Sequence, residues 1–533
     1  MDRLVNIIKK YKIHIILFLA AFFIYDLSNF FIGYTLAGWD EYYYFIGAKN
    51  ILQNHVYLVD GKPPQYPMGY PLLIVPFFYL LGISEYSAAI PSIILGALTV
   101  VLLYEFIRDL IDMRAALFAA LFLMFSYHWM LITDIRSDPP ALFFFLLGIF
   151  AAVKYTKTEG KKFVYLFYFA AGFACLIRYT SGLIFIIVLL YILLSKRVYL
   201  LKHKEVWIGV LLFFAILSPQ MIYNYAHFGS IFATGYSPTN PMYVPKIFSH
   251  PKFNQSWMIE NAKILILGFG TPIFPFFLYG IWDWFNNRNH EELSLIIPWM
   301  AVFFMFFQFY WFSTESVARY LYPIFPAMLI LAGNGFSKMC SKFIIKTDKN
   351  KLRVDRDVFI KKTLVIFLVI ILLLPTVLFW LNTLQKGHAY AILKKETFTW
   401  IHENLDKDDI ILSAPSKDCI AFAYYSQHEI YSLELPKNDL KRLISTHNNT
   451  YIAIRTKWRD QLGEGKWHEI SDTVQWLNET YDLIHLKTFE TKPSGFAPSS
   501  ELIFLVGNKI GLISPYGDRW DIFLVKSTKV EER

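Results

Sequence analysis

Long apolar stretches are the feature that most limits how this chain can fold. Twelve such blocks alternate with short polar loops up to residue 384, in place of the 2- or 3.6-residue alternation typical of soluble strands and helices. The blocks lie approximately at residues 13–34, 69–83, 86–107, 114–133, 139–156, 162–178, 181–195, 205–225, 262–284, 294–312, 319–336 and 361–384. Only 17% of all residues are charged, against about 25% in a typical soluble domain. The chain is therefore predicted to be an α-helical polytopic membrane protein.

Positive charge in the loops predicts which blocks cross the membrane. Several blocks are shorter than the ~20 residues that a spanning helix needs, so length alone does not decide. Basic loops lie at the N-terminus and around residues 108–114, 154–162, 196–204 and 338–362. Such loops favour the cytoplasmic side, and all of them fall there only if block 69–83 does not cross. Pro71 and Pro76, and the sequence GKPPQYPMGYP leading into the block, indicate a short embedded juxtamembrane helix instead.

About eleven spans follow from this topology, with the N-terminus inside and the C-terminus outside. The 35–68 loop, the 134–138 loop, Arg178 and Arg319 then share the extracytoplasmic side of a multi-pass protein of the cell membrane, where they can line one cavity. The first block is expected to remain as an anchor, because it is long enough to span and lacks a small-residue cleavage site.

Charge and cysteine content exclude two other kinds of protein. The net charge of +9 does not indicate nucleic-acid binding, because most basic residues lie in the orienting loops. Cys175, Cys340 and Cys419 are predicted in a span, a cytoplasmic loop and the outer domain, so no disulfide is expected.

The composition becomes that of a soluble protein after residue 384, which divides the chain into a transmembrane domain (1–384) and an extracytoplasmic domain (385–533). Predicted strands are DDIILSA, EIYSLEL, YIAIRTK, YDLIHLKTF and ELIFLVG, and predicted helices are DCIAFAYYS, PKNDLKRLIS and SDTVQWLNETY. This alternation indicates a small α/β domain. It contains no glycine-rich phosphate-binding motif, which favours a docking or acceptor-positioning role without catalysis.

Acidic residues at the predicted outer rim are candidates for catalysis. Asp40 is placed to accept a proton from an acceptor hydroxyl or amine, and Glu41 to hold the acceptor or a neighbouring cation. Both can equally be ordinary interfacial loop residues. In TDIRSDPP, Arg136 and Asp138 lie within a charged cluster between two apolar blocks, which invites a functional explanation. The alternative for Asp138 is a helix N-cap ahead of two prolines.

Basic and aromatic residues at the same rim are candidates for binding. Arg178 in LIRYTSG and Arg319 in ESVARYLYPIFP end predicted spans, where they either reach lipid headgroups or bind a lipid phosphate with paired donors. Lys62 is a further candidate for contact with the donor phosphate. Tyr66 and Tyr70 either line an acceptor path or belong to an aromatic belt at the interface. His55, His128 and His227 show no metal-ligand spacing and are expected to be structural.

Four motifs in a fixed order carry a resemblance to a known family. An Asp-Glu pair follows the first helix, a proline-rich stretch precedes a short embedded helix, Asp-Pro lies in the second outer loop, and RYLYPIFP follows later. Together they resemble the GT-C superfamily of glycosyltransferases, specifically its protein O-mannosyltransferase and lipid A aminoarabinose transferase branch, over about residues 1–340. The chain departs from mannosyltransferases in having Pro-Pro-Gln-Tyr-Pro where they show His-Pro-Pro-Leu, and it lacks the β-trefoil insert of eukaryotic members. A prokaryotic relative with its own acceptor is therefore favoured.

The resemblance implies an inverting transfer of a sugar from a polyprenyl-phosphate donor to a glycan, lipid or protein acceptor. It assigns Asp40 and Asp138 as the two loop acids and places Arg178 near the donor phosphate, with Arg319 and Tyr320 in the last motif. A phosphate leaving group needs charge stabilisation and no general acid. No cofactor is firmly predicted, and a divalent metal ion is left open. A polytopic transporter and a non-catalytic envelope scaffold remain the alternatives.

Overall fold

The computed structural model describes residues 2–32, 36, 39–126, 129, 133–235, 255–263, 265, 273–287, 290–309, 319–345, 354–413, 427–447, 449–455, 458–490 and 519–526. The chain forms two compact units. The first, the helical unit, comprises Met1–Asn29 and Tyr43–Leu381, and the second comprises Phe30–Tyr42 and Asn382–Arg533. The predicted domain boundary between residues 384 and 385 stays a prediction.

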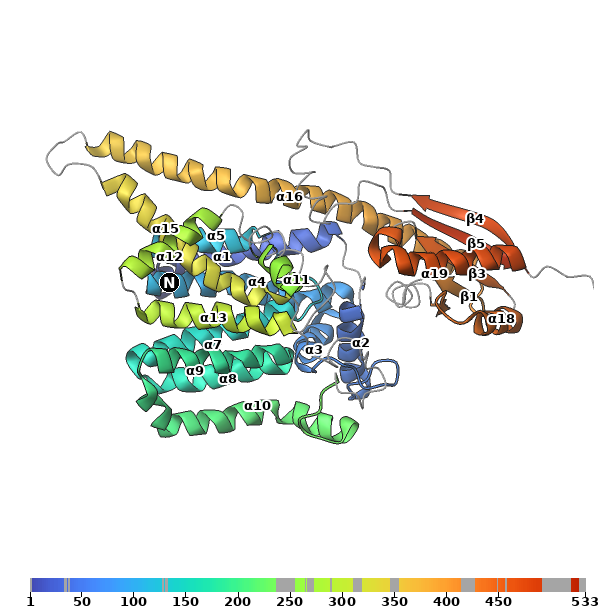
Figure 1. The fold of residues 1–533 in the computed structure, drawn as a ribbon, viewed down its shortest axis with the longest axis horizontal. Helices are drawn as coiled ribbons and strands as arrows, with labels where there is room; N and C mark the ends of the chain where they lie inside the picture. The colour runs from blue at the N-terminus through green and yellow to red at the C-terminus, as the bar shows by residue number, and fades with distance from the viewer. Residues whose placement is uncertain are drawn as a thin grey trace, which may run out of the picture. The chain divides into compact units, whose positions relative to one another are not determined.

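Helices make up the first unit, and each predicted apolar block falls on one or more of them (Figure 1). The α-helices up to the unit boundary are α1 (Asp2–Ile32), α2 (Trp39–Asn54), α3 (Gly69–Leu81), α4 (Glu85–Leu110), α5 (Met113–Met124), α7 (Asp138–Thr158), α8 (Lys161–Ile177), α9 (Leu183–Leu194), α10 (Lys204–Phe228), α11 (Gln255–Lys263), α12 (Phe274–Asn286), α13 (His290–Phe309), α15 (Phe325–Ile345) and α16 (Val354–Asn404). Short 3-10 helices are η1 (Tyr179–Gly182), η2 (Val198–Lys202) and η4 (Tyr322–Ile324).

Packing in the helical unit is organised around neighbouring helix pairs. α7 pairs with α8, which also contacts α10, and α4 lies against α3, α5 and α7. α15 contacts α5 and α12, and α13 contacts α9. Polar side chains begin several helices: Ser84 caps α4, and Asp112 caps α5 by accepting the backbone N–H of Ala115. The predicted helical fold is confirmed.

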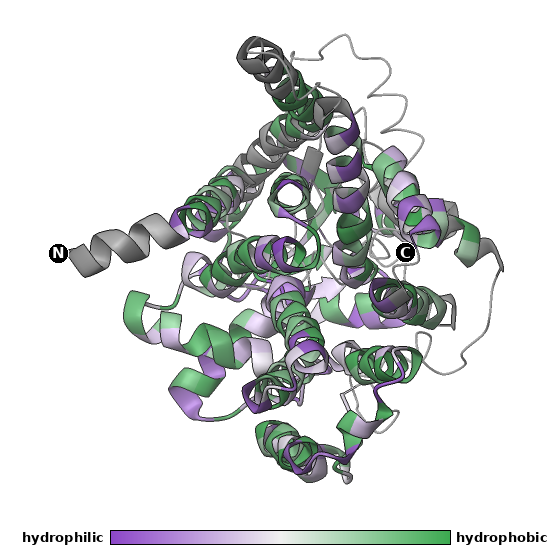
Figure 2. Cartoon of the chain, turned by 90° about the vertical axis from the view of Figure 1, so that its left-hand side faces the viewer, coloured by the Kyte–Doolittle hydropathy of each residue, from purple (hydrophilic) through white to green (hydrophobic). Residues whose placement is uncertain are grey.

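Four helices of the described residues are long and apolar enough to cross a membrane, namely residues Tyr11–Phe31, Glu85–Leu110, Asp138–Thr158 and Lys204–Phe228. Others, such as α8 and α9, are shorter, so the number of eleven spans stays a prediction. Large apolar side chains also point away from the protein on α10, where Leu211 is 71% exposed. In a view along the helix axes, hydrophobic residues occur along most of these helices (Figure 2), and α10 exposes such residues on an outward face. Such faces are typical of helices that contact lipid.

The block predicted not to cross forms α3, a helix of 13 residues. At 1.5 Å per residue it reaches about 20 Å, less than the ~30 Å of a hydrocarbon core. Because α5, α9 and α12 are about as short, this length does not distinguish α3 from the predicted spans, and its embedded position stays a prediction. Tyr79, Leu80 and Leu81 at its C-terminal end are exposed apolar side chains.

The second unit contains a five-stranded sheet of order β2-β1-β3-β5-β4. The strands are β1 (Ile410–Ser413), β2 (Glu429–Ser432), β3 (Thr450–Arg455), β4 (Asp482–Glu490) and β5 (Arg519–Lys526), and the helices are α18 (Lys437–Thr446) and α19 (Trp458–Thr480). β1 is parallel to β2 and β3, whereas β5 is antiparallel to β3 and β4. Four predicted strands and two predicted helices are confirmed; ELIFLVG, DCIAFAYYS and Cys419 lie outside the described residues, and β5 was not predicted.

Candidate active site

A pocket lies at the start of α7 in the helical unit. Its walls come from α7, the turn between α8 and α9, α13, and the segment that leads into α15. The lining residues are Asp138, Ala141, Leu142, Phe145, Arg178, Thr180, Ser181, Phe303, Arg319, Tyr320, Tyr322 and Pro323. The pocket therefore joins a charged part to an apolar part.

Asp138 is the acidic residue of this pocket and the first residue of α7. Ser137 takes the N-cap position, and its hydroxyl lies 2.8 Å from the hydroxyl of Tyr44 in α2. The Asp138 carboxylate is 5% exposed, and its Oδ1 accepts a hydrogen bond from Nη1 of Arg178. Helix capping, the structural alternative for Asp138, is therefore not what the structure shows. Its negative charge nevertheless lies at the favourable, positive end of the helix dipole.

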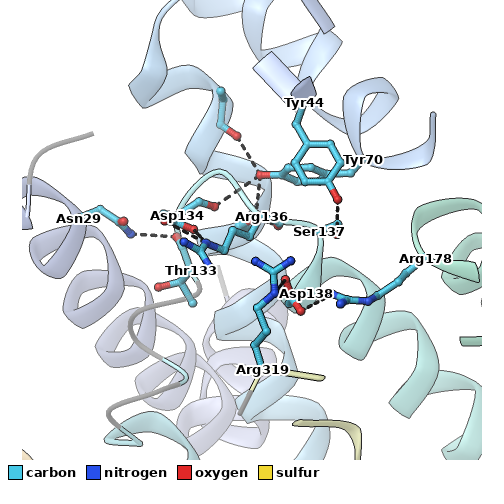
Figure 3. A network of polar contacts seen from close by, with 12 residues as sticks. Asn29, Tyr44, Tyr70, Thr133, Asp134, Arg136, Ser137, Asp138, Arg178 and Arg319 are labelled. Carbon is cyan, nitrogen blue, oxygen red and sulfur yellow. Dashed lines mark hydrogen bonds and ion pairs between the residues drawn. The ribbon is translucent and has the colours of Figure 1, made fainter. Parts of the chain in front are cut away.

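Two arginines that are far apart in the chain meet at Asp138 (Figure 3). Arg178 directly follows α8, and Arg319 directly precedes Tyr320. The Nε atom of Arg319 lies 3.9 Å from Oδ2 of Asp138, an ion-pair distance too long for a hydrogen bond. The guanidinium carbons of Arg178 and Arg319 also lie 4.7 Å and 5.2 Å from the ring centroid of Tyr320, so the ring stabilises both cations.

The pocket lining carries more positive than negative charge. Two guanidinium groups face one carboxylate, and the other lining residues are uncharged. Arg178 is charged at physiological pH, because a guanidinium group keeps its proton and the Asp138 carboxylate lies beside it. Because guanidinium groups offer paired donors to phosphate oxygens, this part of the pocket fits an anionic group.

Apolar side chains line the other part of the pocket. Phe145 of α7 lies 5.4 Å from Phe303 of α13, measured between ring centroids. Trp299, also in α13, donates its indole N–H to the carbonyl oxygen of Pro323 at 2.6 Å. This bond holds the RYLYPIFP segment, and with it Arg319, against α13.

A second polar cluster lies close to Asp138, in the turn before α7 (Figure 3). Nε of Arg136 lies 3.0 Å from Oδ1 of Asp134, and the Ser92 hydroxyl donates to the carbonyl oxygen of Arg136 at 2.5 Å. Tyr70 is fully buried, with its hydroxyl 2.8 Å from that of Ser92. Arg136 and Tyr70 are thus adjacent to the pocket but do not line it, and their predicted substrate contacts stay predictions.

The loop before α3 contains two further predicted residues. The Tyr66 ring packs against those of Tyr43 and Tyr44, with centroid distances of 5.7 Å and 5.1 Å. Lys62 is exposed, and its backbone pairs with Val59 through two hydrogen bonds of 2.9 Å. The structure does not bring Lys62 or Tyr66 into the lining of the pocket.

Asp40 and Glu41 both lie in the first turn of α2. Asp40 is half-buried and Glu41 is buried. The two residues belong to the second compact unit, whereas α2 from Tyr43 onward belongs to the helical unit. Their catalytic roles stay predictions.

The surroundings of Asp138 do not fit a divalent metal ion. No three His, Cys, Asp or Glu side chains gather at metal-binding distance within them. At Asp138 two guanidinium groups already surround the carboxylate and would repel a dication. His55 and His227 are exposed, and His128 lies outside the described residues.

Several residues of this region were not predicted. Tyr44 could have been found, because it belongs to the aromatic run that follows the Asp-Glu pair. Phe145 and Phe303 carried no signal, since each is one of many phenylalanines in apolar helices. The buried amides of Gln220 and Asn224 in α10 did carry one: two polar residues four apart in an apolar helix.

Known proteins resemble parts of this chain in sequence or in fold. The family model for dolichyl-phosphate-mannose-protein mannosyltransferase matches residues 65–223, a range that includes Asp138 and Arg178. No curated protein matches the chain. ArnT from Cupriavidus metallidurans in the apo state has a similar structure, with a TM-score of 0.60 and 14% identity over 89% of this chain and 96% of that chain. The chain has a GT-C fold.

Two further structures extend the GT-C fold over nearly the whole chain. ArnT bound to undecaprenyl phosphate gives a TM-score of 0.59 and 14% identity, over 96% of this chain and 97% of that chain. The apo oligosaccharyltransferase of Archaeoglobus fulgidus gives 0.58 and 13%, over 90% of this chain and 73% of that chain. The predicted GT-C-like fold with a small C-terminal sheet is thereby confirmed.

Proposed function

We propose that this protein is a membrane glycosyltransferase that moves a sugar from a polyprenyl-phosphate donor to an acceptor by an inverting displacement. The observation that carries the proposal is the pocket at the start of α7, where Arg178, Arg319 and Tyr320 adjoin an apolar wall. Relatives of the same fold support it: ArnT binds undecaprenyl phosphate, and the archaeal oligosaccharyltransferase AglB binds a dolichol-phosphate and an inhibitory peptide.

The two parts of the pocket suit the two parts of such a donor. The guanidinium groups of Arg178 and Arg319 would bind the phosphate oxygens, and Phe145 and Phe303 would contact the first units of the lipid chain. Asp138 neutralises one of the two cations and holds Arg178 in place. In this proposal Asp138 acts as a positioning residue, in place of the second catalytic acid implied by the family resemblance.

The reaction needs one proton acceptor and a stabilised leaving group. The acceptor oxygen or nitrogen attacks the anomeric carbon, the bond from this carbon to the phosphate oxygen breaks, and its electrons leave with the polyprenyl phosphate. We assign Asp40 to take the proton of the acceptor, with Glu41 beside it. The arginines stabilise the negative charge on the leaving phosphate, so no general acid is required.

We place the reaction on the extracytoplasmic side. The distribution of basic loops supports this orientation, since it leaves α2, the start of α7 and Arg178 opposite the cytoplasmic loops. The C-terminal unit then lies outside as well, where it can dock or position an acceptor. Cysteine labelling from outside intact cells at residue 60 tests the orientation, and protection of that residue would contradict it.

The test of the proposed activity is Asp40→Asn. Purified protein in lipid nanodiscs is given an undecaprenyl-phosphate sugar, and released undecaprenyl phosphate and glycosylated acceptor are measured. We expect the loss of a general base to reduce transfer by about 10²- to 10⁴-fold, with unchanged membrane insertion. The matched control is Asp60→Asn, which removes an exposed carboxylate from the same predicted loop and should leave transfer near the wild-type rate.

Three outcomes separate the candidate functions. Normal turnover by Asp40→Asn refutes the assignment of the base. Movement of a sugar or lipid across the membrane without any covalent transfer indicates a transporter. A wild-type protein that neither transfers a sugar nor moves a molecule across the membrane supports the third candidate, a non-catalytic scaffold.

A further inference from the structure

The N-terminus of α3 is in direct contact with the end of α8, one residue before Arg178. A Cβ atom at Gly69 would lie 2.3 Å from the carbonyl oxygen of Leu176 and 2.7 Å from the backbone nitrogen of Ile177. Only glycine allows this approach, because a Cβ atom does not come so close to the backbone atoms of another element. Leu176 also packs against Met68, the N-cap residue of α3. The backbone position from which Arg178 projects therefore depends on α3.

Two buried amides of α10 bridge the same two elements. The backbone N–H of Met68 donates to Oε1 of Gln220 at 2.8 Å, and Nε2 of Gln220 donates to Oδ1 of Asn224 at 2.8 Å. The amide of Asn224 in turn lies next to the buried hydroxyl of Tyr179, the neighbour of Arg178 in the chain. A continuous set of polar contacts thus runs from the start of α3 to the turn that carries Arg178.

The setting of these amides argues for more than an incidental contact. α10 is an apolar candidate span, most of whose surface is exposed, yet Gln220 and Asn224 are each only 3% exposed. An amide in an apolar environment destabilises the fold unless its hydrogen bonds are made. Leucine at both positions would pack without that requirement, so the pair fits a role that apolar side chains do not fill.

We propose that Gln220 and Asn224 are positioning residues for Arg178, which they hold at the pocket through Met68 and Tyr179. The inference rests on the proposed function, because it gives Arg178 a phosphate to bind. The amides touch neither the pocket nor any reacting atom. They fix the backbone on both sides of Arg178, so that its guanidinium group meets Asp138 and an anionic ligand in one orientation.

A double-mutant cycle with undecaprenyl phosphate as the probe tests the proposal. Binding to protein in nanodiscs is measured for wild type, Gln220→Met, Arg178→Ala and the double variant. We expect Gln220→Met to weaken binding about tenfold, the effect of losing buried hydrogen bonds, and to have less than a twofold effect when Arg178 is already absent. Equal effects in both backgrounds would mean that Gln220 supports the fold generally, and would overturn the proposal.

Controls separate positioning from folding. Asn334→Leu removes a buried amide of α15 that bonds Asp283 in α12, so it should lower the melting temperature while leaving lipid binding unchanged. If Gln220→Met does not fold, Tyr179→Phe deletes a single hydroxyl of the same set, and we expect about threefold weaker binding that depends on Arg178. Wild-type affinity in Tyr179→Phe would then overturn the proposal.

Failure of the inference differs from failure of the proposed function. A wild-type protein that does not bind undecaprenyl phosphate contradicts the proposed donor and with it the ligand of Arg178. A wild type that binds, together with a folded Gln220→Met variant of equal affinity, contradicts the positioning role alone.

Discussion

Buried charge gathers at the start of α7 and near the C-terminal end of α12, and these two places differ in how that charge is satisfied. At the start of α7 two guanidinium groups face one carboxylate beside an open pocket. Near the C-terminal end of α12, Asp283 accepts hydrogen bonds from Asn287 and Asn334 at 2.8 Å and 3.1 Å, with Nζ of Lys338 3.8 Å away. At the first place an excess positive charge is available to bind a ligand. At the second place the carboxylate accepts its hydrogen bonds from residues of the surrounding helices.

Close helix packing accompanies the second arrangement. A Cβ atom at Gly280 in α12 would lie 1.9 Å from the carbonyl oxygen of Leu331, and one at Gly335 in α15 would lie 2.0 Å from that of Phe276. The backbones of α12 and α15 are therefore in contact. The comparison teaches that a buried acid is not by itself a sign of function; excess charge of one sign next to a pocket is the more informative feature.

The largest effect is expected at the α12–α15 contact. Gly280→Val forces the two backbones apart, and we expect it to lower the free energy of unfolding by at least ~3 kcal/mol, seen as a loss of folded protein or a much lower melting temperature in detergent. Gly182→Ala is the matched control near the pocket, because its Cβ would meet only Sγ of Cys175, at 3.8 Å. Equal melting temperatures of the two variants would contradict the inferred difference in packing between Gly280 and Gly182.

An intermediate effect is expected from the pocket arginine that makes the looser ion pair. Arg319→Ala removes a charge that we assign to the donor phosphate, so affinity for undecaprenyl phosphate should fall about thirtyfold, with the smaller loss in Arg319→Lys. Lys338→Ala, at the other place, should change affinity less than twofold. Titration of each variant in nanodiscs with undecaprenyl phosphate measures both affinities. Similar losses in the two variants would contradict the assignment of a binding role to the start of α7 alone.

The smallest effect is expected from removal of divalent ions. Because two guanidinium groups surround Asp138, EDTA should change the rate of sugar transfer by less than twofold. The measurement is the initial rate of undecaprenyl phosphate release with and without chelator. A large loss that added Mn²⁺ or Mg²⁺ restores would contradict this prediction and would place a metal elsewhere in the site.

Helices were predictable from the sequence because a lipid environment demands long apolar stretches, and each block fell on a helix. Block 69–83 forms the 13-residue helix α3, but α5, α9 and α12 are about as short, so its placement beside the membrane stays a prediction. The strand β5 was missed because WDIFLVK lies in a C-terminal stretch where ELIFLVG showed the stronger apolar pattern.

Part of the candidate site was also predictable. Asp138, Arg178, Arg319 and Tyr320 drew attention because charged groups are rare at the ends of apolar helices, and the structure brings all four into one pocket. Their pairing was not predictable, since it depends on how α7 and α8 pack and on where the chain returns 141 residues after Arg178. Tyr70 illustrates the same limit. Its place in the sequence fits an aromatic belt at the interface, but in the fold it is buried and its hydroxyl contacts that of Ser92.

The ion pair between Asp138 and Arg178 has a consequence for biogenesis. Both partners lie in one helical hairpin, α7 and α8, so the carboxylate and the guanidinium can enter the bilayer together as a neutral pair. Arg319 is synthesised much later, and its arrival with α15 adds the surplus cation. Until the segment that carries Arg319 has been synthesised, the charges of Asp138 and Arg178 therefore compensate each other in the nascent protein.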